Sequence, residues 1–265
     1  MLNRTDNHRH WKQTTGIIAC GLVLSLCGCR QMSQQHNSGG VSHYQQGNYQ
    51  GAIAGFQQAL TTDPTNGDAY YNLAASYHQL AKQTNNPQLY TQAEQLYNSC
   101  LDRDPNNVEC HRALAVLLVE TNRQDKAFTL MNNWATAAPQ LSAPRVELAR
   151  LYEEKGDTKN AASNLAVALQ NNPNDPRALA AMGRLREQTG DVQQALANYQ
   201  RAYQLNPTQP GVAERLAALQ RSGFPTTAPV AAAPAATAPG MSPVAPQTQP
   251  GTRVATPPVA TTPRY

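Results

Sequence analysis

Aromatic side chains are scarce in this sequence of 265 residues: they make up 6% of it, and only three of them are Phe. Alanine is abundant instead. This combination suits helices that approach one another closely through small side chains. A helical protein is therefore the first expectation.

The sequence also lacks the motifs of nucleotide binding and catalysis. It contains no G-x-G-x-x-G, no P-loop, no H-E-x-x-H and no G-x-S-x-G. No two of the five cysteines have the C-x-x-C spacing of a metal site, and the six histidines are scattered along the sequence. His36 and His43 are seven residues apart in a weak helix, and His78 and His111 are expected on helix surfaces. We therefore expect no enzyme, no cofactor and no metal.

Charge of one sign is not concentrated anywhere. The net charge is +4, and half of it comes from the first 29 residues. The remainder is close to neutral and has no basic run. A nucleic-acid partner is therefore not expected.

No apolar run is long enough to cross a bilayer comfortably. Residues 16–28 are apolar, but 13 residues fall short of the roughly 20 that a spanning helix needs. They follow a stretch with Arg4, Arg9 and Lys12. This order predicts a signal peptide over residues 1–28. The alternatives are a short uncleaved anchor and a buried helix.

The end of the apolar run resembles the bacterial lipobox. Leu26-Cys27-Gly28-Cys29 places Leu three residues before Cys29 and a small residue directly before it. The resemblance implies that Cys29 is lipidated, becomes the first residue of the mature protein and holds it to a membrane. In similar lipoproteins, an Asp directly after the lipidated Cys retains the protein in the inner membrane. This chain has Arg30 at that position, so the resemblance implies an outer-membrane lipoprotein that faces the periplasm. Residues 29–40 are expected to form a polar tether.

The middle of the chain is a repeat with a unit of 34 residues. Each unit has an Ala, a large residue four positions later, and a Pro twelve positions after the Ala. The five prolines are Pro64, Pro105, Pro139, Pro173 and Pro207. Such a period is typical of a helical repeat protein.

The residues at the other positions resemble the tetratricopeptide repeat (TPR) family. Repeat two has Tyr70, Leu73, Ala74 and Tyr77 at the positions of the family pattern, and repeats four and five are similar. The resemblance implies an all-α, right-handed superhelix of helix-turn-helix repeats, an α-solenoid. The expected repeats are 33–66, 67–107, 108–141, 142–175 and 176–209. A capping helix is expected at 210–222, and a disordered Pro/Ala/Thr-rich tail at 223–265.

Three departures from the repeat pattern carry local expectations. Gly39-Gly40 weaken the first helix of repeat one, which is expected to start late or fray. Seven extra residues around Thr84–Pro87 mean that the first helix of repeat two is extended or that its turn becomes a loop. Trp134 stands where Ala is usual and is expected in the core, unless Ala135 takes the small position.

The resemblance also implies which residues face the concave groove. The candidate partner-binding residues are Tyr71, His78, Arg112, Arg150, Glu153, Arg184 and Glu187. Arg150 and Arg184 occupy one position of successive repeats, as do Glu153 and Glu187. They form either intrahelical Arg–Glu pairs three residues apart or a polar ladder for a peptide. Asn37 and Val41 stand where relatives that clamp carboxylates have Lys and Asn, so that ligand class is disfavoured.

Cys100 and Cys110 would be the only thiols of a chain lipidated at Cys29. They form either a disulfide across the helix junction or two buried free thiols, and the sequence slightly favours the thiols. A separation of their Cα atoms beyond about 7 Å would exclude the disulfide.

These features predict a non-enzymatic lipoprotein that acts as a scaffold for other proteins or peptides at the cell envelope. The alternative is a pilotin-like assembly lipoprotein of a pilus or secretion system, acting on a secretin. A third, weaker class is an enzyme subunit or a regulator of cell-wall hydrolases.

Overall fold

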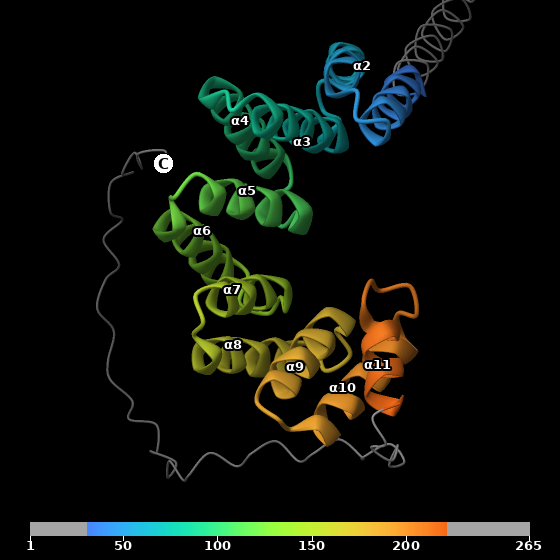
Figure 1. Ribbon diagram of the computed structural model, residues 1–265. Helices are drawn as coiled ribbons and strands as arrows, with labels where there is room; N and C mark the ends of the chain where they lie inside the picture. The colour runs from blue at the N-terminus through green and yellow to red at the C-terminus, as the bar shows by residue number, and fades with distance from the viewer. Residues whose placement is uncertain (1–30, 222–265) are drawn as a thin grey trace, which may run out of the picture. The chain divides into compact units, whose positions relative to one another are not determined.

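The computed structural model describes residues 31–221, and no strand occurs in that range (Figure 1). The first helix covers residues 31–45 and is called the N-terminal helix below. Ten further helices follow within the described range. They are α2 (Tyr49–Thr62), α3 (Gly67–Thr84), α4 (Pro87–Arg103), α5 (Val108–Glu120), α6 (Gln124–Ala137), α7 (Ala143–Glu154), α8 (Thr158–Asn171), α9 (Pro176–Gln188), α10 (Val192–Leu205) and α11 (Val212–Arg221).

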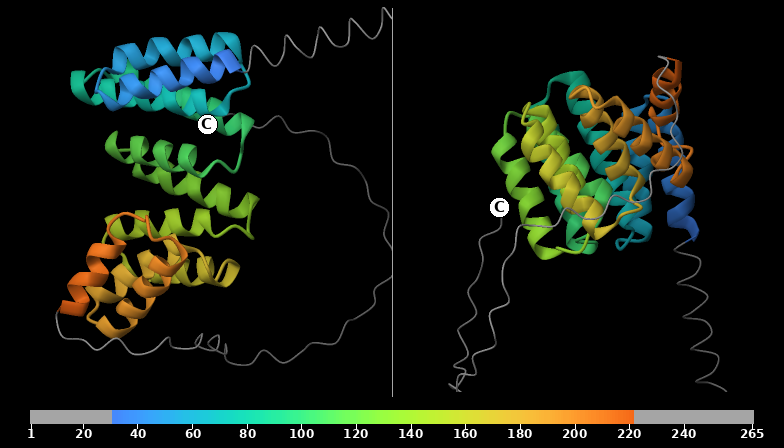
Figure 2. Two further views of the ribbon diagram at one scale, coloured as in Figure 1. Left: turned by 90° about the vertical axis from the view of Figure 1, so that its right-hand side faces the viewer. Right: turned by 90° about the horizontal axis from the view of Figure 1, so that it is seen from below.

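The helices form consecutive antiparallel pairs that stack in chain order (Figure 2). We call the first helix of each pair an A helix and the second a B helix. The A helices are the N-terminal helix, α3, α5, α7 and α9, and the B helices are α2, α4, α6, α8 and α10. Each expected repeat contains one such pair. The expectation of an all-α solenoid is confirmed.

The repeated small and large residues build the core. The five repeat alanines are fully buried, and the large residue four positions later is buried beside each of them. The large residues are Phe56, Tyr97, Met131, Leu165 and Tyr199. A small side chain at one position allows two helices to approach, and the large one fills the remaining space.

Asn, Asp and Gly define where the helices begin and turn. Asn48, Asn66, Asn107, Asp157 and Asp191 each accept a hydrogen bond from the backbone N–H three residues later, which caps the helix that follows. The turns within repeats one, four and five use Gly with positive φ, as the Gly-Asn and Gly-Asp pairs predict. In repeats two and three an Asn takes that conformation, with φ of 50° and 58°.

The expectations for the start of the array were wrong. Residues 31–45 form one continuous helix that includes Gly39 and Gly40, so most of the expected tether at 29–40 is helical. Gly40 is needed because a Cβ atom there would lie 2.6 Å from Cε1 of Phe56. Ser33 binds this helix both to its partner α2 and to the start of the next pair: its Oγ donates to the carbonyl of Ala59 in α2 and accepts from Nδ2 of Asn66, the residue before α3.

The extra residues of repeat two lengthen both of its helices. They have 18 and 17 residues, whereas the helices of the other pairs from α2 to α10 have 12 to 14. Of the two alternatives for the insertion, an extended first helix or a turn that becomes a loop, the structure shows the extended helix, and the second helix of the pair is extended as well.

The last helix packs on the final pair and covers its end. Val212 and Leu219 of α11 are buried against α9 and α10, and Leu216 is partly buried with them. None of the helices between residues 31 and 221 combines the length and the apolar character needed to cross a membrane.

Candidate partner-binding surface

A ladder of ion pairs joins successive A helices. The cluster of His78 and Lys82 with Glu120 links α3 to α5, and Arg112 with Glu147 links α5 to α7. Glu153 with Arg184 then links α7 to α9. Arg215 of α11 extends the ladder by pairing with Glu187. We call these residues, together with Arg150, which pairs with Glu147 within α7, the A-helix ladder.

Glu147 is the most buried member of the ladder, because 2% of its side chain is exposed. Arg112 donates to its Oε1 atom from Nε at 2.8 Å and from Nη2 at 2.6 Å. Arg150 donates to its Oε2 atom at 3.2 Å. A buried carboxylate is tolerated when charged donors satisfy both oxygens, so two arginines from adjacent helices are held in place around this group.

The expected Arg–Glu pairs three residues apart in one helix are not the ones that form. Arg150 pairs with Glu147 and Glu154 of its own helix, whereas Glu153 binds Arg184 of the next A helix at 2.7 Å. Glu187 binds Arg215 at 3.1 Å and accepts a hydrogen bond from the Tyr199 hydroxyl. Glu153 and Glu187 thus pair with residues of other helices in the stack, whereas Arg150 pairs within α7.

Two ladder residues on α7 keep a buried polar atom without a partner. Nη2 of Arg150 and Oε1 of Glu153 are shielded from solvent and make no hydrogen bond within the described residues. One is a donor and the other an acceptor, and they lie three residues apart on one helix face. Buried polar atoms are normally paired, so this pair is suited to a ligand that offers an acceptor and a donor close together.

His78 does not lie on a free surface, contrary to both of its expected roles. It is only 5% exposed, and its Nε2 atom lies 2.8 Å from Oε2 of Glu120. Burial lowers the pKa of His78, and the hydrogen bond to Glu120 offsets part of that shift. Tyr71 is half-buried, with its ring centroid 6.2 Å from that of Tyr97, and burial raises the pKa of its hydroxyl. These two residues mainly support the junction of repeats two and three.

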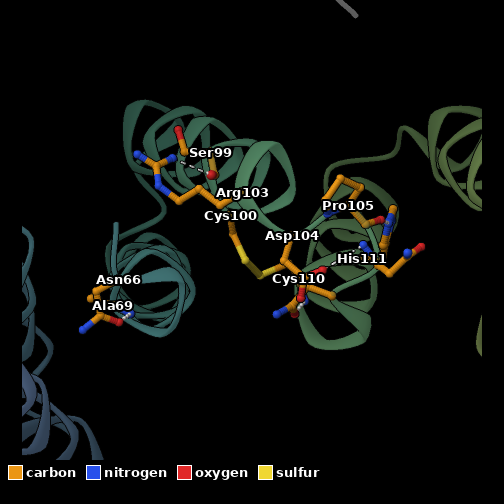
Figure 3. The surroundings of a disulfide bond; sticks show 11 residues. Asn66, Ala69, Ser99, Cys100, Arg103, Asp104, Pro105, Cys110 and His111 are labelled. Atoms are coloured by element: carbon orange, nitrogen blue, oxygen red, sulfur yellow. Dashed lines mark hydrogen bonds between the residues drawn. A yellow bond between two sulfur atoms is a disulfide. The ribbon is translucent and has the colours of Figure 1, made fainter. Parts of the chain in front are cut away.

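A disulfide joins Cys100 of α4 to Cys110 of α5, with the Cα atoms 6.4 Å apart (Figure 3). The alternative that the sequence slightly favoured, two buried free thiols, was therefore wrong. The two cysteines are 1% and 0% exposed. The bond closes the short loop between repeats two and three.

His111 and Trp134 pack beside this disulfide. Their rings stack with centroids 4.0 Å apart, and Nε1 of Trp134 donates to Asn106 at 3.1 Å. Nε2 of His111 lies 3.0 Å from the carbonyl oxygen of Pro105. The expectation that His111 lies on a surface was wrong, because it is 6% exposed, and burial lowers its pKa. Trp134 is in the core, as expected, and Ala135 is buried next to it.

The sequence did not reveal a polar cleft of about 440 Å³ at the start of the array. It lies where the N-terminal helix meets the loops that precede α3 and α5. Its lining residues are Gln34, Asn37, Asp63, Thr65, Asn66, Gly67, Asp68, Asp104 and Asn107. Asp63 and Asp104 are of a residue type that suits turns, which the sequence shows. That their two loops line one cleft follows only from the stacking of the repeats. In the part of the chain that the structure describes, no cluster of His, Cys, Asp or Glu is suited to hold a metal ion.

Two segments of the chain match models of one repeat family. Residues 40–80 match a model described as TPR repeat, and residues 146–210 match a model described as tetratricopeptide repeat. These matches support the tetratricopeptide assignment of the helix pairs in both halves of the array. A comparison with curated proteins found no match.

Solved structures with similar folds include several TPR proteins. TTC0263, a thermophilic TPR protein of Thermus thermophilus, is 22% identical with a TM-score of 0.53, over 71% of this chain and 99% of that one. PilF of Pseudomonas aeruginosa is 20% identical with a TM-score of 0.49, over 74% and 86%. YrrB, a TPR protein with an unusual peptide-binding site, is 17% identical with a TM-score of 0.38, over 68% and 89%. The first of these shows the shared TPR superhelix, a class of fold suited to protein–protein contacts.

Proposed function

We propose that this chain is a scaffold lipoprotein of the bacterial envelope whose A-helix ladder binds an extended segment of a partner protein. The observation that carries the proposal is the unpaired donor of Arg150 next to the unpaired acceptor of Glu153. Every residue of an extended peptide other than proline offers one carbonyl acceptor and one N–H donor. The side chains of Arg150 and Glu153 are 25% and 13% exposed, so a rotation of each can bring its unpaired atom to such a backbone, whereas a purely apolar partner would leave both atoms unpaired.

Two features support a location outside the cytoplasm. The lipobox-like sequence ends at Cys29, which lies outside the described residues. Independently, the Cys100–Cys110 disulfide belongs to the class of bonds that persist in oxidising compartments. We infer an outer-membrane lipoprotein that faces the periplasm.

The ladder proposal is tested by capturing partners from an envelope extract with the full mature chain. The test variant is Arg150→Ala/Arg184→Ala, and the control variant is Lys126→Ala/Arg201→Ala, which removes two positive charges from the B helices α6 and α10. Loss of a charge-assisted hydrogen bond should weaken binding by about tenfold or more. We expect the partner to be recovered with the wild type and the control but lost with the test variant. Equal recovery with all three chains would remove the ladder from the binding site.

A second candidate is a pilotin-like role in assembling a secretin. The arrangement that favours it is a lipobox followed at once by a TPR array. Under this proposal, a secretin produced together with the chain should reach the outer membrane as a multimer, and a chain with Cys29→Ser should leave it in the inner membrane. Correct secretin assembly without the chain would exclude this role.

A further inference from the structure

The start of the array is bound tightly into the stack within a few residues of Cys29. Ser33 is fully buried, with its Oγ atom 2.9 Å from the Ala59 carbonyl and 3.0 Å from Nδ2 of Asn66. Nδ2 of Asn72 donates to Oδ1 of Asn37 at 3.1 Å, and Gly40 packs against Phe56. The N-terminal helix therefore cannot pivot apart from α2 and α3.

The chain between the lipidation site and this helix is very short. Arg30 is the only residue between Cys29 and residue 31, where the helix is already formed. Two residue steps of extended chain span at most about 7 Å. The headgroup layer on each side of a bilayer is about 5–8 Å thick. An anchor of this length reaches across the headgroups and no further.

We infer that the array has no free tether and that its first repeat rests end-on against the lipid headgroups. This inference relies on the lipid anchor at Cys29 given under the proposed function. The occupant of this end of the stack is the outer surface of a phospholipid bilayer. The partner must then approach the ladder from repeats three to five, away from the membrane.

The chemistry of the anchored end suits a headgroup layer. The N-terminal helix contains no Asp, Glu, Lys or Arg, and the cleft beside it is lined by Asp63, Asp68 and Asp104, so the lipid anchor and not attraction to anionic lipids must hold this end at the bilayer. Its Met32 is 56% exposed, and the two other large apolar side chains of the described residues with high exposure, Tyr203 and Leu205, lie in α10. Met32 can therefore insert among the headgroups without loss of packing in the array.

Two threonines provide matched reporters of orientation. Thr65 and Thr208 each follow a repeat proline, and the backbone N–H and hydroxyl of each donate to the side chain two residues before. Thr65 is in the loop next to the N-terminal helix, whereas Thr208 precedes α11 at the opposite end of the stack (Figure 1). Both are exposed. A Cys at either position can carry a fluorophore, because the native disulfide is buried.

The experiment uses the full lipidated chain in vesicles of phosphatidylethanolamine with a minority of phosphatidylglycerol and a nitroxide-headgroup lipid as quencher. We expect the label of Thr65→Cys to lose most of its fluorescence and that of Thr208→Cys to lose little. Inserting 20 Gly/Ser residues after Arg30, with a root-mean-square length of about 25 Å, should abolish the loss at residue 65. High salt should leave the loss unchanged, because the lipid anchor and not attraction between charges holds this end at the bilayer.

Each other outcome contradicts the inference in a different way. Equal quenching at both positions would show that the array lies on its side, and no quenching at residue 65 would show that it stands away from the bilayer. Quenching that survives the inserted linker, or that disappears in high salt, would show that surface attraction and not the short anchor holds the array. Mass spectrometry of the N-terminal peptide distinguishes a failure of the proposed lipid anchor from a failure of the inferred orientation. A peptide without lipid overturns the anchor, whereas a lipidated chain without quenching at residue 65 overturns only the orientation.

Discussion

Two adjacent glycines of the N-terminal helix have opposite surroundings. A Cβ atom added to Gly39 would meet nothing within 4 Å, whereas one added to Gly40 would lie 2.6 and 2.7 Å from the ring of the buried Phe56. Replacing Gly by Ala favours a helix by about 0.5–1 kcal/mol when nothing else changes. Overpacking a core costs about 1–3 kcal/mol.

We therefore expect Gly39→Ala to raise the free energy of unfolding by about 0.5–1 kcal/mol and Gly40→Ala to lower it by about 1–2 kcal/mol. Urea unfolding followed by far-UV circular dichroism measures both changes. The two variants make the same chemical change one residue apart, so each is the control for the other. A gain in stability for both would show that Phe56 moves aside without cost.

These glycines also show which structural features could be predicted from single residues of the sequence. Helix propensity is a local property, and it predicted fraying because the contact with Phe56 comes from another helix. The buried residues were predictable, since the repeat pattern specifies each small and large position. The ion pairs were not, because spacing along a helix indicates neighbours three or four residues away, while Glu153 and Glu187 bind residues of the following repeat or of α11.

The disulfide acts between elements, because it joins the last B-helix turn of repeat two to the first A-helix turn of repeat three. Its two cysteines are ten residues apart in the sequence. Closing a loop of this size removes unfolded-state entropy worth about 3 kcal/mol at 25 °C. We expect Cys100→Ala/Cys110→Ala to lower the free energy of unfolding by about 2–3 kcal/mol.

Trp134 is placed to report this change, since its ring stacks on His111 next to Cys110. Its fluorescence during denaturation gives the measurement for a chain that begins at Arg30, which omits Trp11. A reductant should lower the stability of the wild-type chain by the same amount and leave the double variant unchanged. A wild-type chain whose stability is the same with and without reductant would show that the bridge adds nothing.

Helix order and most turns could be predicted because one pattern occurs five times. Gly at the turns of repeats one, four and five and Pro near the end of every B helix mark the boundaries. The insertion in repeat two was ambiguous, because Asn85 can either end a helix or continue a loop. The structure places it at φ 50° directly after α3, which lengthens the pair without adding a loop.

At the scale of the whole molecule, the array is a row of units that each contact their neighbours. The stability of such a row is roughly a sum of the units and the contacts between them, so a change at one end should stay there. α11 has the position of an end cap: Val212 and Leu219 are buried on the last pair, and Arg215 pairs with Glu187. The far end is different, because the N-terminal helix is itself part of the first pair.

Removing α11 should therefore destabilise repeat five and leave the centre intact. A chain ending at Gly211 is compared with one ending at Arg221, so that the two differ only in this helix. Two buried apolar side chains contribute about 1.5–3 kcal/mol each, which predicts that amide protection in α9 and α10 falls by about 3–6 kcal/mol. The pair with Arg215 adds little, because that side chain is more than half exposed. Hydrogen exchange should show unchanged protection in α5 and α6, since their neighbours are all retained. An equal loss of protection from α3 to α10 would instead mean that the five repeats unfold as one cooperative unit, and that the ion-pair ladder couples them over its full length.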